Sequence, residues 1–180
     1  MKSLGIVRSI DELGRVVIPK EIRKTMRLRD GDPLDIFAGA EGVIILKRYS
    51  PVGGIVAIAQ SYAEALSQKT DLPILITDQD HVLFSTGLSA EEDANGHKTS
   101  RSLEKTIENG VDFIAQPDGK HLHPVDGLKR EAAVACPITG RGNPAGCVVM
   151  LMNKAGDMPT QTEVALAQVA ACFLGRQLGI

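Results

Sequence analysis

Residues 5–35, GIVRSIDELGRVVIPKEIRKTMRLRDGDPLD, decide how the first part of this chain folds and what it can contact. The segment contains two short β-branched runs, a glycine-containing turn and a proline that starts a helix. Residues 1–29 hold eight lysines and arginines against three acids, a charge of +5 in a chain whose net charge is −2. A compact basic element on an acidic protein indicates a surface for a polyanion, and the alternative is a charged face that only meets water.

The pattern within this segment predicts two strands followed by a helix. Residues 5–10 predict a strand, residues 11–14 a turn and residues 16–18 a second, buried strand. Pro19 then sets φ for the first turn of a helix, where its missing N–H costs nothing. One face of that helix is apolar, with Ile22 and Met26. The opposite face is basic and consists of Lys20, Arg23, Lys24 and Arg27.

The next residues complete a small β-rich domain. Gly31 and Pro33 end the helix, because glycine accepts a left-handed conformation and proline cannot continue a helix. Residues 34–38 and 43–47 predict a hairpin around residues 39–42. A domain of fewer than fifty residues with short strands is marginally stable alone, so we expect a second copy to complete its core and cover its edges.

The first fifty residues resemble the AbrB-type swapped-hairpin DNA-binding domain of bacterial transition-state and sporulation regulators. The strings DELGRVVIPKEIR, GDPLDIF and VIILKRYSP carry this resemblance. It implies that two protomers interleave their hairpins in one small β-barrel, whose arginines contact double-stranded DNA. By position, these contacts fall on Arg8, Arg15, Arg23 and Lys24. An arginine is usual at position 24. Lysine keeps the attraction to phosphate but lacks the planar guanidinium group that makes two parallel hydrogen bonds to guanine.

Charge and composition divide the chain into two modules. Residues 1–49 carry +3 and residues 50–180 carry −5, which indicates separate tasks. We predict domains over residues 1–50 and 55–180, joined by a linker over residues 51–54. Within the second domain the patterns predict helices over residues 55–68, near residues 103–107, and from a capping box at Thr160 and Glu163 to about residue 178. They also predict strands over residues 74–77, 82–85, 111–115, 132–138 and 145–153. Such an order predicts an α+β fold with an antiparallel sheet flanked by helices.

This order of elements resembles a GAF domain, a fold of small-molecule sensors. The whole chain resembles the SpoVT/AbrB family, which joins an AbrB-type domain to a GAF domain at this boundary. The resemblance implies a homodimer through the N-terminal domain, a homotetramer overall, and activation or repression of late sporulation genes. Two roles of the GAF-like domain stay open: sensing an unknown small-molecule effector, or tetramerisation without a ligand.

A protein-binding module is the rival from another class. Antitoxins of toxin–antitoxin pairs use the same swapped hairpin, but they append a disordered tail that wraps a toxin. The second half of this chain has regular apolar patterns, so we expect it to fold.

Other candidate sites carry weaker signals. His121 and His123, with Asp118 and Asp126 nearby, could offer metal ligands, but exposed loop histidines are usually solvated, so we predict no metal site. The glycines of residues 140–146 lack the GK[ST] ending of a phosphate loop and fit a hairpin turn. Cysteines could serve as in GAF-fold enzymes that reduce methionine sulfoxide, and the chain has three: Cys136, Cys147 and Cys172.

The pattern around these cysteines does not favour catalysis. Cys147 and Cys172 lie in apolar patterns where core packing is the default, and no histidine is spaced to activate any of the three. We therefore expect neither an enzyme nor a cofactor. An odd number of cysteines without CxxC spacing, no apolar run of eighteen residues and no apolar N-terminal segment together indicate a cytoplasmic protein with no membrane contact. The DNA binding that the resemblance implies would make it nucleoid-associated.

Overall fold

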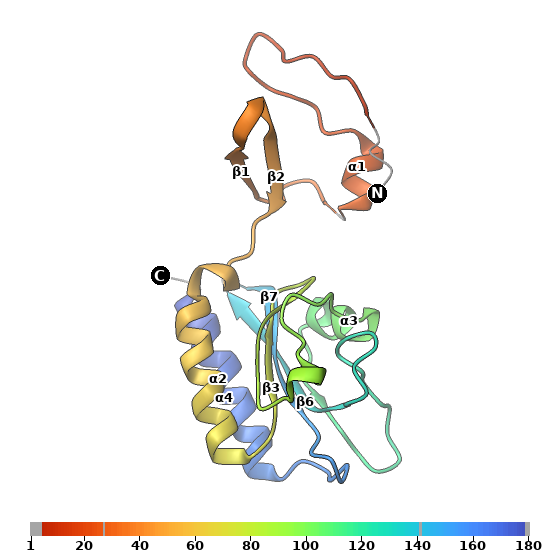
Figure 1. The fold of residues 1–180 in the computed structure, drawn as a ribbon, viewed down its shortest axis with the longest axis vertical. Coiled ribbons are helices and arrows are strands. Elements are labelled where there is room, and N and C mark those ends of the chain that lie inside the picture. The colour runs from red at the N-terminus through yellow and green to blue at the C-terminus, as the bar shows by residue number, and fades with distance from the viewer. Residues whose placement is uncertain (1–4, 27, 141, 179–180) are drawn as a thin grey trace. The chain divides into compact units, whose positions relative to one another are not determined.

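The computed structural model describes residues 5–26, 28–140 and 142–178 of the chain (Figure 1). The chain divides between Tyr49 and Ser50 into two compact units. Among the described residues, no helix combines the length and the apolar character needed to cross a bilayer.

The first unit contains the predicted basic helix and the predicted hairpin. Helix α1 spans Lys20–Thr25, directly after Pro19, whose φ of −57° suits a helix start. Strands β1 (Leu34–Ala38) and β2 (Ile44–Arg48) pair antiparallel, and a 3₁₀ turn over Ala40–Gly42 joins them. Between helix and hairpin, Gly31 takes the expected left-handed conformation, with φ of +91°.

The predicted strands over residues 5–10 and 16–18 are wrong for the single chain, whose described residues contain no strand before β1. The turn between them is confirmed, because the N–H of Asp11 donates to the carbonyl of Arg15 at 3.0 Å and Gly14 has a φ of +75°. The flanking apolar side chains stay exposed, with Val7 at 94% and Val17 at 72%. A β-branched run becomes a strand only beside a neighbour that offers unpaired N–H and C=O groups, and the described residues of this chain provide no such neighbour there.

The second unit is a five-stranded antiparallel sheet with helices on both faces. Its elements are α2 (Val56–Thr70), β3 (Ile74–Thr77), β4 (Val82–Thr86), α3 (Arg101–Asn109), β5 (Phe113–Ile114), β6 (Ala132–Gly140), β7 (Asn143–Leu151) and α4 (Gln161–Gln177), with 3₁₀ turns over Val52–Ile55 and Ala90–Glu92. The strand order is β4-β3-β7-β6-β5. The predicted α+β fold with an antiparallel sheet and flanking helices is confirmed.

The core of this unit lies on both faces of the sheet. Helices α2 and α4 run side by side over one face, and α3 lies over the other (Figure 1). Successive side chains of β3 point to opposite faces of the sheet, so the strand contributes to the core on both sides. Ile74 and Ile76 pack with the α2 and α4 side chains, while Leu75 packs with Leu103 of α3. From Ala145 onward every side chain of β7 is buried, which fits its central place in the sheet.

Local signals set the ends of several elements as expected. At the start of α4 the N–H of Thr160 donates to Glu163 Oε2 at 2.6 Å, and the N–H of Glu163 donates to Thr160 Oγ1 at 3.3 Å, so the predicted capping box forms. Strand β5 is shorter than predicted and pairs only with residues 134 and 135 of β6. Strands β6 and β7 run further into the glycine-rich stretch than predicted, and that stretch is their hairpin turn; Arg141 lies outside the described residues.

The small residues of α2 and α4 pack mostly inside the unit. Ala59, Ala63, Ala167, Ala170, Ala171 and Gly175 are buried. Ala57, Ala65 and Ala165 on the same two helices are exposed. A Cβ at Gly175 would lie 2.4 Å from the carbonyl oxygen of Thr139, so this glycine lets α4 approach β6.

Candidate nucleic-acid interface

The turn at residues 11–15 holds Arg15 in a defined position. One carboxylate oxygen of Asp11 accepts hydrogen bonds from the N–H groups of Leu13 at 3.0 Å and Arg15 at 2.8 Å. The other oxygen accepts from Arg15 Nε at 2.8 Å. These hydrogen bonds from Arg15 and Leu13 hold the pKa of Asp11 below its ordinary value of 3.8. The Arg15 side chain is 71% exposed, so its guanidinium is anchored but accessible.

A second carboxylate anchors Arg23 on helix α1. Arg23 Nη1 lies 2.9 Å from Asp30 Oδ1, and the Asp30 side chain is almost fully exposed. The Nε of Arg23 is buried and lacks a hydrogen-bond partner among the described residues. The Arg23 side chain as a whole is 42% exposed, so its other N–H groups can reach a phosphate oxygen.

The other two predicted contact residues are free cations. Arg8 lies on the first arm of the loop and Lys24 follows Arg23 on α1. Both are exposed, and neither makes an ion pair within the described part of the chain. Arg27, predicted on the same helix face, lies outside the described residues.

These positions give the first unit two kinds of cation. Arg15 and Arg23 are each oriented by an aspartate, whereas Arg8 and Lys24 have no such carboxylate partner among the residues that the structure describes. An arginine fork held in place can make paired hydrogen bonds to a phosphate or a guanine edge, and a free cation adds attraction without fixed geometry.

The sequence did not reveal the aspartates that orient these arginines. Counted as charge, Asp11 and Asp30 only reduce the basic character of the segment. The signal for Asp11 was its place at the start of a turn, where a short carboxylate bonds to the backbone two residues on. Asp32 does similar work: it accepts from the N–H of Arg29 at 2.8 Å and lies 3.8 Å from Arg48 Nη2 of β2.

Two of the four histidines of the second unit lie beside one carboxylate. His121 Nδ1 lies 2.7 Å from Glu131 Oε2, and His123 Nε2 lies 3.5 Å from Glu131 Oε1. In the ranges that the structure describes, no group of three or more His, Cys, Asp or Glu side chains is arranged to hold a metal ion, and Asp118 and Asp126 do not join the histidines in one.

The cysteines differ in their surroundings. Burial and the nearby Asp112 raise the pKa of Cys136 to about 12, and burial raises the pKa of Cys147 as well. Both thiols keep their protons at neutral pH, so they are poor nucleophiles. The expectation of core packing is confirmed for Cys147 but is wrong for Cys172, which is exposed on α4.

Both halves of the chain match models of known families. A model described as stage V sporulation protein T C-terminal, transcription factor, matches residues 55–179. A model described as antidote-toxin recognition MazE, bacterial antitoxin, matches residues 7–53. Stage V sporulation protein T of Bacillus subtilis (strain 168) is 39% identical over 180 residues, 99% of each chain. Transition state regulatory protein AbrB of the same organism is 57% identical over 51 residues, 28% of this chain and 52% of that protein.

Solved structures similar to the chain are GAF domains and their relatives. The cyanobacteriochrome receptor PixJ superposes with a TM-score of 0.58 at 11% identity, over 72% of this chain and 97% of that one. A GAF domain/HD domain protein from Geobacter sulfurreducens gives 0.53 at 14% identity, over 71% and 91%. At these identities the likeness establishes the fold alone, and it confirms the predicted GAF-like architecture.

Proposed function

This chain belongs to the stage V sporulation protein T family, and from that membership we propose that it is a DNA-binding transcriptional regulator of late sporulation genes, acting by activation or repression. We assign DNA binding to residues 1–50 and sensing or assembly to residues 55–180, with residues 51–54 as the linker. The observation that carries the proposal is the set of accessible cations on the loop and helix of the first unit, two of them oriented by aspartates.

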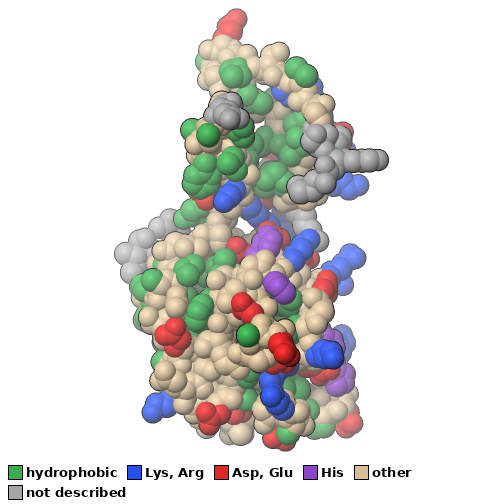
Figure 2. Space-filling model, viewed as in Figure 1, with side chains coloured by type: hydrophobic (Ala, Val, Ile, Leu, Met, Phe, Trp, Pro, Cys, Tyr) green, Lys and Arg blue, Asp and Glu red, His purple; other side chains and the backbone are tan. Residues whose placement is uncertain are grey.

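The DNA-binding form is a homodimer through the first unit. Hydrophobic side chains gather at the surface of that unit (Figure 2). They come from the loop and from the hairpin: Val7, Ile10, Leu13, Val16, Val17, Ile36, Phe37, Val43, Ile44 and Ile45. Exposed apolar surface of this extent beside unpaired backbone is covered when two copies interleave their strands into one barrel.

Two copies would present up to eight cations to duplex DNA: Arg8, Arg15, Arg23 and Lys24 of each. Contacts to that many phosphates would lower the affinity by roughly 10³–10⁵ between 50 and 200 mM salt, because binding releases condensed counterions. In this arrangement Arg15 and Arg23 stay oriented by Asp11 and Asp30 and offer their remaining N–H groups to the nucleic acid, and Lys24 supplies attraction to phosphate. Recognition through the shape of A·T-rich or bendable sites fits a surface with few asparagines and glutamines.

A second contact between copies would use helices α2 and α4. Tyr62 of α2 stacks on Phe173 of α4 with 5.2 Å between ring centroids. Ile58 and Val169 expose further apolar surface on the same two helices. A contact between copies there, together with the dimer of the first unit, would yield a homotetramer.

The rival functions make different demands on the second unit. An antitoxin needs a disordered tail, whereas residues 50–180 form a unit with its own core. Sensing of a small-molecule effector requires a binding site in that unit, and tetramerisation alone requires only the helix surface.

The test of DNA binding is a salt series with the full chain and the Arg15→Ala variant. With eight phosphate contacts the slope of log K against log salt is about −7, and removing two of them flattens it by about 1.8. The matched control is Lys105→Ala, which removes an exposed cation from α3 of the second unit and leaves the slope unchanged. Equal affinity and equal slope for Arg15→Ala and the wild type would count against the assignment.

A further inference from the structure

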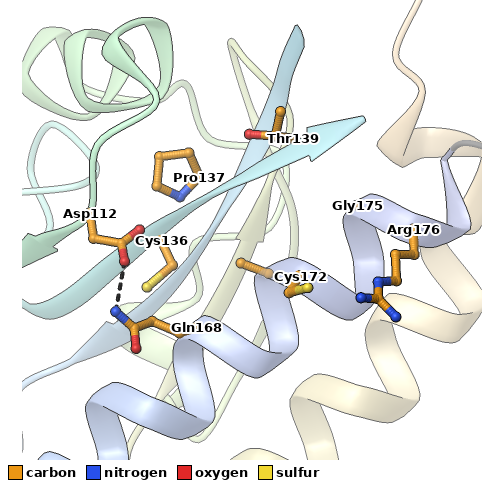
Figure 3. A pocket seen from close by; sticks show the side chains of 9 residues that line it. Asp112, Cys136, Pro137, Thr139, Gln168, Cys172, Gly175 and Arg176 are labelled. Atoms are coloured by element: carbon orange, nitrogen blue, oxygen red, sulfur yellow. Dashed lines mark hydrogen bonds between the residues drawn. The ribbon is translucent and has the colours of Figure 1, made fainter. Parts of the chain in front are cut away.

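A groove lies on the second unit, between helix α4 and the edge of the sheet at β6 (Figure 3). Its volume is about 580 Å³, within the range of small-molecule sites. Asp112 and Gln168 lie at one end, Gly175 and Arg176 at the other, and Cys172 between them. On the α3 face of the sheet, by contrast, apolar side chains such as Leu103, Leu122 and Val125 pack into a buried cluster.

The groove exists because the sheet edge is left uncovered. Strand β5 pairs with β6 only at residues 134 and 135, so β6 continues to Gly140 without a neighbour on that side. Ala171 contributes only a methyl group and Gly175 no side chain, so no bulky side chain of α4 fills the groove at these two positions. The N–H of Ala115 donates to the carbonyl of Ala133, so by alternation Pro137 also turns its backbone to the open edge.

The end at Asp112 is a positioned carboxylate. Gln168 Nε2 donates to Asp112 Oδ2 at 2.9 Å, a contact that joins α4 to the residue before β5. Burial and the nearby Asp112 raise the pKa of the Cys136 thiol, so the thiol stays neutral beside this carboxylate. The hydrogen bond from Gln168 holds the carboxylate at the mouth of the groove and leaves it lone pairs for a cationic ligand group.

The opposite end is a guanidinium. Arg176 lines the groove and is exposed, and it makes no ion pair with any residue in the described part of the chain. Gln168 and Arg176 are eight helical positions apart, which places them roughly 12 Å apart along α4. An extended peptide of three residues spans about 10 Å.

We propose that this groove binds a short linear zwitterion of the di- or tripeptide class, with its ammonium group at Asp112 and its carboxylate at Arg176. The middle of the ligand contacts Pro137, Ala171 and Cys172, which carry no charge. A longer strand does not fit as well, because Pro137 has no N–H to give to a neighbouring strand and blocks continuous pairing along the edge.

The proposal deepens the sensor role proposed above, and it rests on that role only where gene regulation is concerned. Binding itself is tested on the full chain without DNA. If the groove binds no peptide, the salt dependence of DNA binding is unaffected. If the chain binds no DNA, peptide binding is unaffected, so the two results can be told apart.

The experiment is a saturation-transfer NMR titration of the full chain at low salt with three probes. Trialanine carries both charges, acetyl-trialanine lacks the ammonium group and trialanine amide lacks the carboxylate. We expect saturable binding of trialanine and roughly two- to fivefold weaker binding of each blocked peptide, the range of an exposed ion pair. No saturable signal, or equal binding of all three, overturns the proposal.

Two variants assign the ends of the ligand. Asp112→Asn keeps an acceptor for Gln168 and removes the charge, so acetylation of the peptide should no longer weaken binding. Arg176→Gln should likewise abolish the effect of amidation. Asp118→Asn and Lys105→Gln change the same charges on exposed residues outside the groove and should behave as the wild type. If Asp112→Asn fails to fold, the comparison of blocked and free peptides on the wild type still decides the matter.

Discussion

The two units of this chain contrast in where their apolar side chains lie. All the buried hydrophobic side chains of the described chain belong to the second unit. In the first unit Pro19 is the one buried residue among those described, while its valines and isoleucines from loop and hairpin face outward. The second unit therefore completes its hydrophobic core by itself. The first unit has enough apolar side chains for a core, but within one chain no second layer of secondary structure covers them.

The largest expected effect tests the incomplete unit. Val17→Asp places a charge on a side chain that the dimer would enclose, and an unpaired buried charge costs roughly 3–5 kcal/mol in each protomer. We expect loss of the N-terminal dimer and a fall in DNA affinity of about 100-fold or more, measured by sedimentation and by duplex binding.

The matched control for this substitution is Val111→Asp. Val111 is 65% exposed in the second unit, close to the 72% of Val17 in the first. Because exposure within one chain is similar at the two positions, only the proposed dimer distinguishes them. Equal DNA binding by both variants would contradict the claim that a dimer buries Val17 but leaves Val111 exposed.

A smaller effect tests the complete unit. Leu174→Ala truncates a side chain of α4 that is fully buried. Removal of its buried methyl groups costs roughly 2–5 kcal/mol of the free energy of unfolding, since the surroundings collapse only in part. Urea denaturation of the full chain should show this loss in the transition of the second unit. Val111→Ala, which removes exposed methyl groups, should change the stability by no more than about 0.5 kcal/mol.

The smallest effect compares one carboxylate in each unit by pH. Hydrogen bonds from Arg15 hold the pKa of Asp11 below 3.8, and a hydrogen bond from Arg130 holds that of Glu92 below 4.5. A lowered folded-state pKa stabilises the fold above the unfolded value, and that contribution is lost as the pH falls through the folded value. NMR titration of the carboxyl carbons should give both midpoints below those ordinary values. Arg130→Gln should raise the titration midpoint of Glu92 and leave that of Asp11 unchanged. A shift of both midpoints would contradict the claim that each pKa is lowered by its own neighbouring arginine.

The sequence predicted single helices, hairpins and their order correctly, but it did not predict correctly which segments pair with one another. The helix after Pro19, the hairpin of β1 and β2 and the order of elements in the GAF-like domain were all predicted. The strands over residues 5–10 and 16–18 were not found in the single chain, since pairing depends on a neighbour that no local pattern describes. The four proposed DNA contacts came from a resemblance, and the structure adds which of them are held by aspartates and which are free.

By itself, then, the sequence determined what depends on residues a few positions apart. The capping box of Thr160 and Glu163, the left-handed Gly31 and the turn at residues 11–14 are of this kind, because their partners are close along the chain. Only the tertiary structure decided that Asp112 meets Gln168 across 56 positions and that α4 settles against Thr139 at Gly175. Those contacts follow from how helices and strands pack, and packing is set by the shapes of both partners at once.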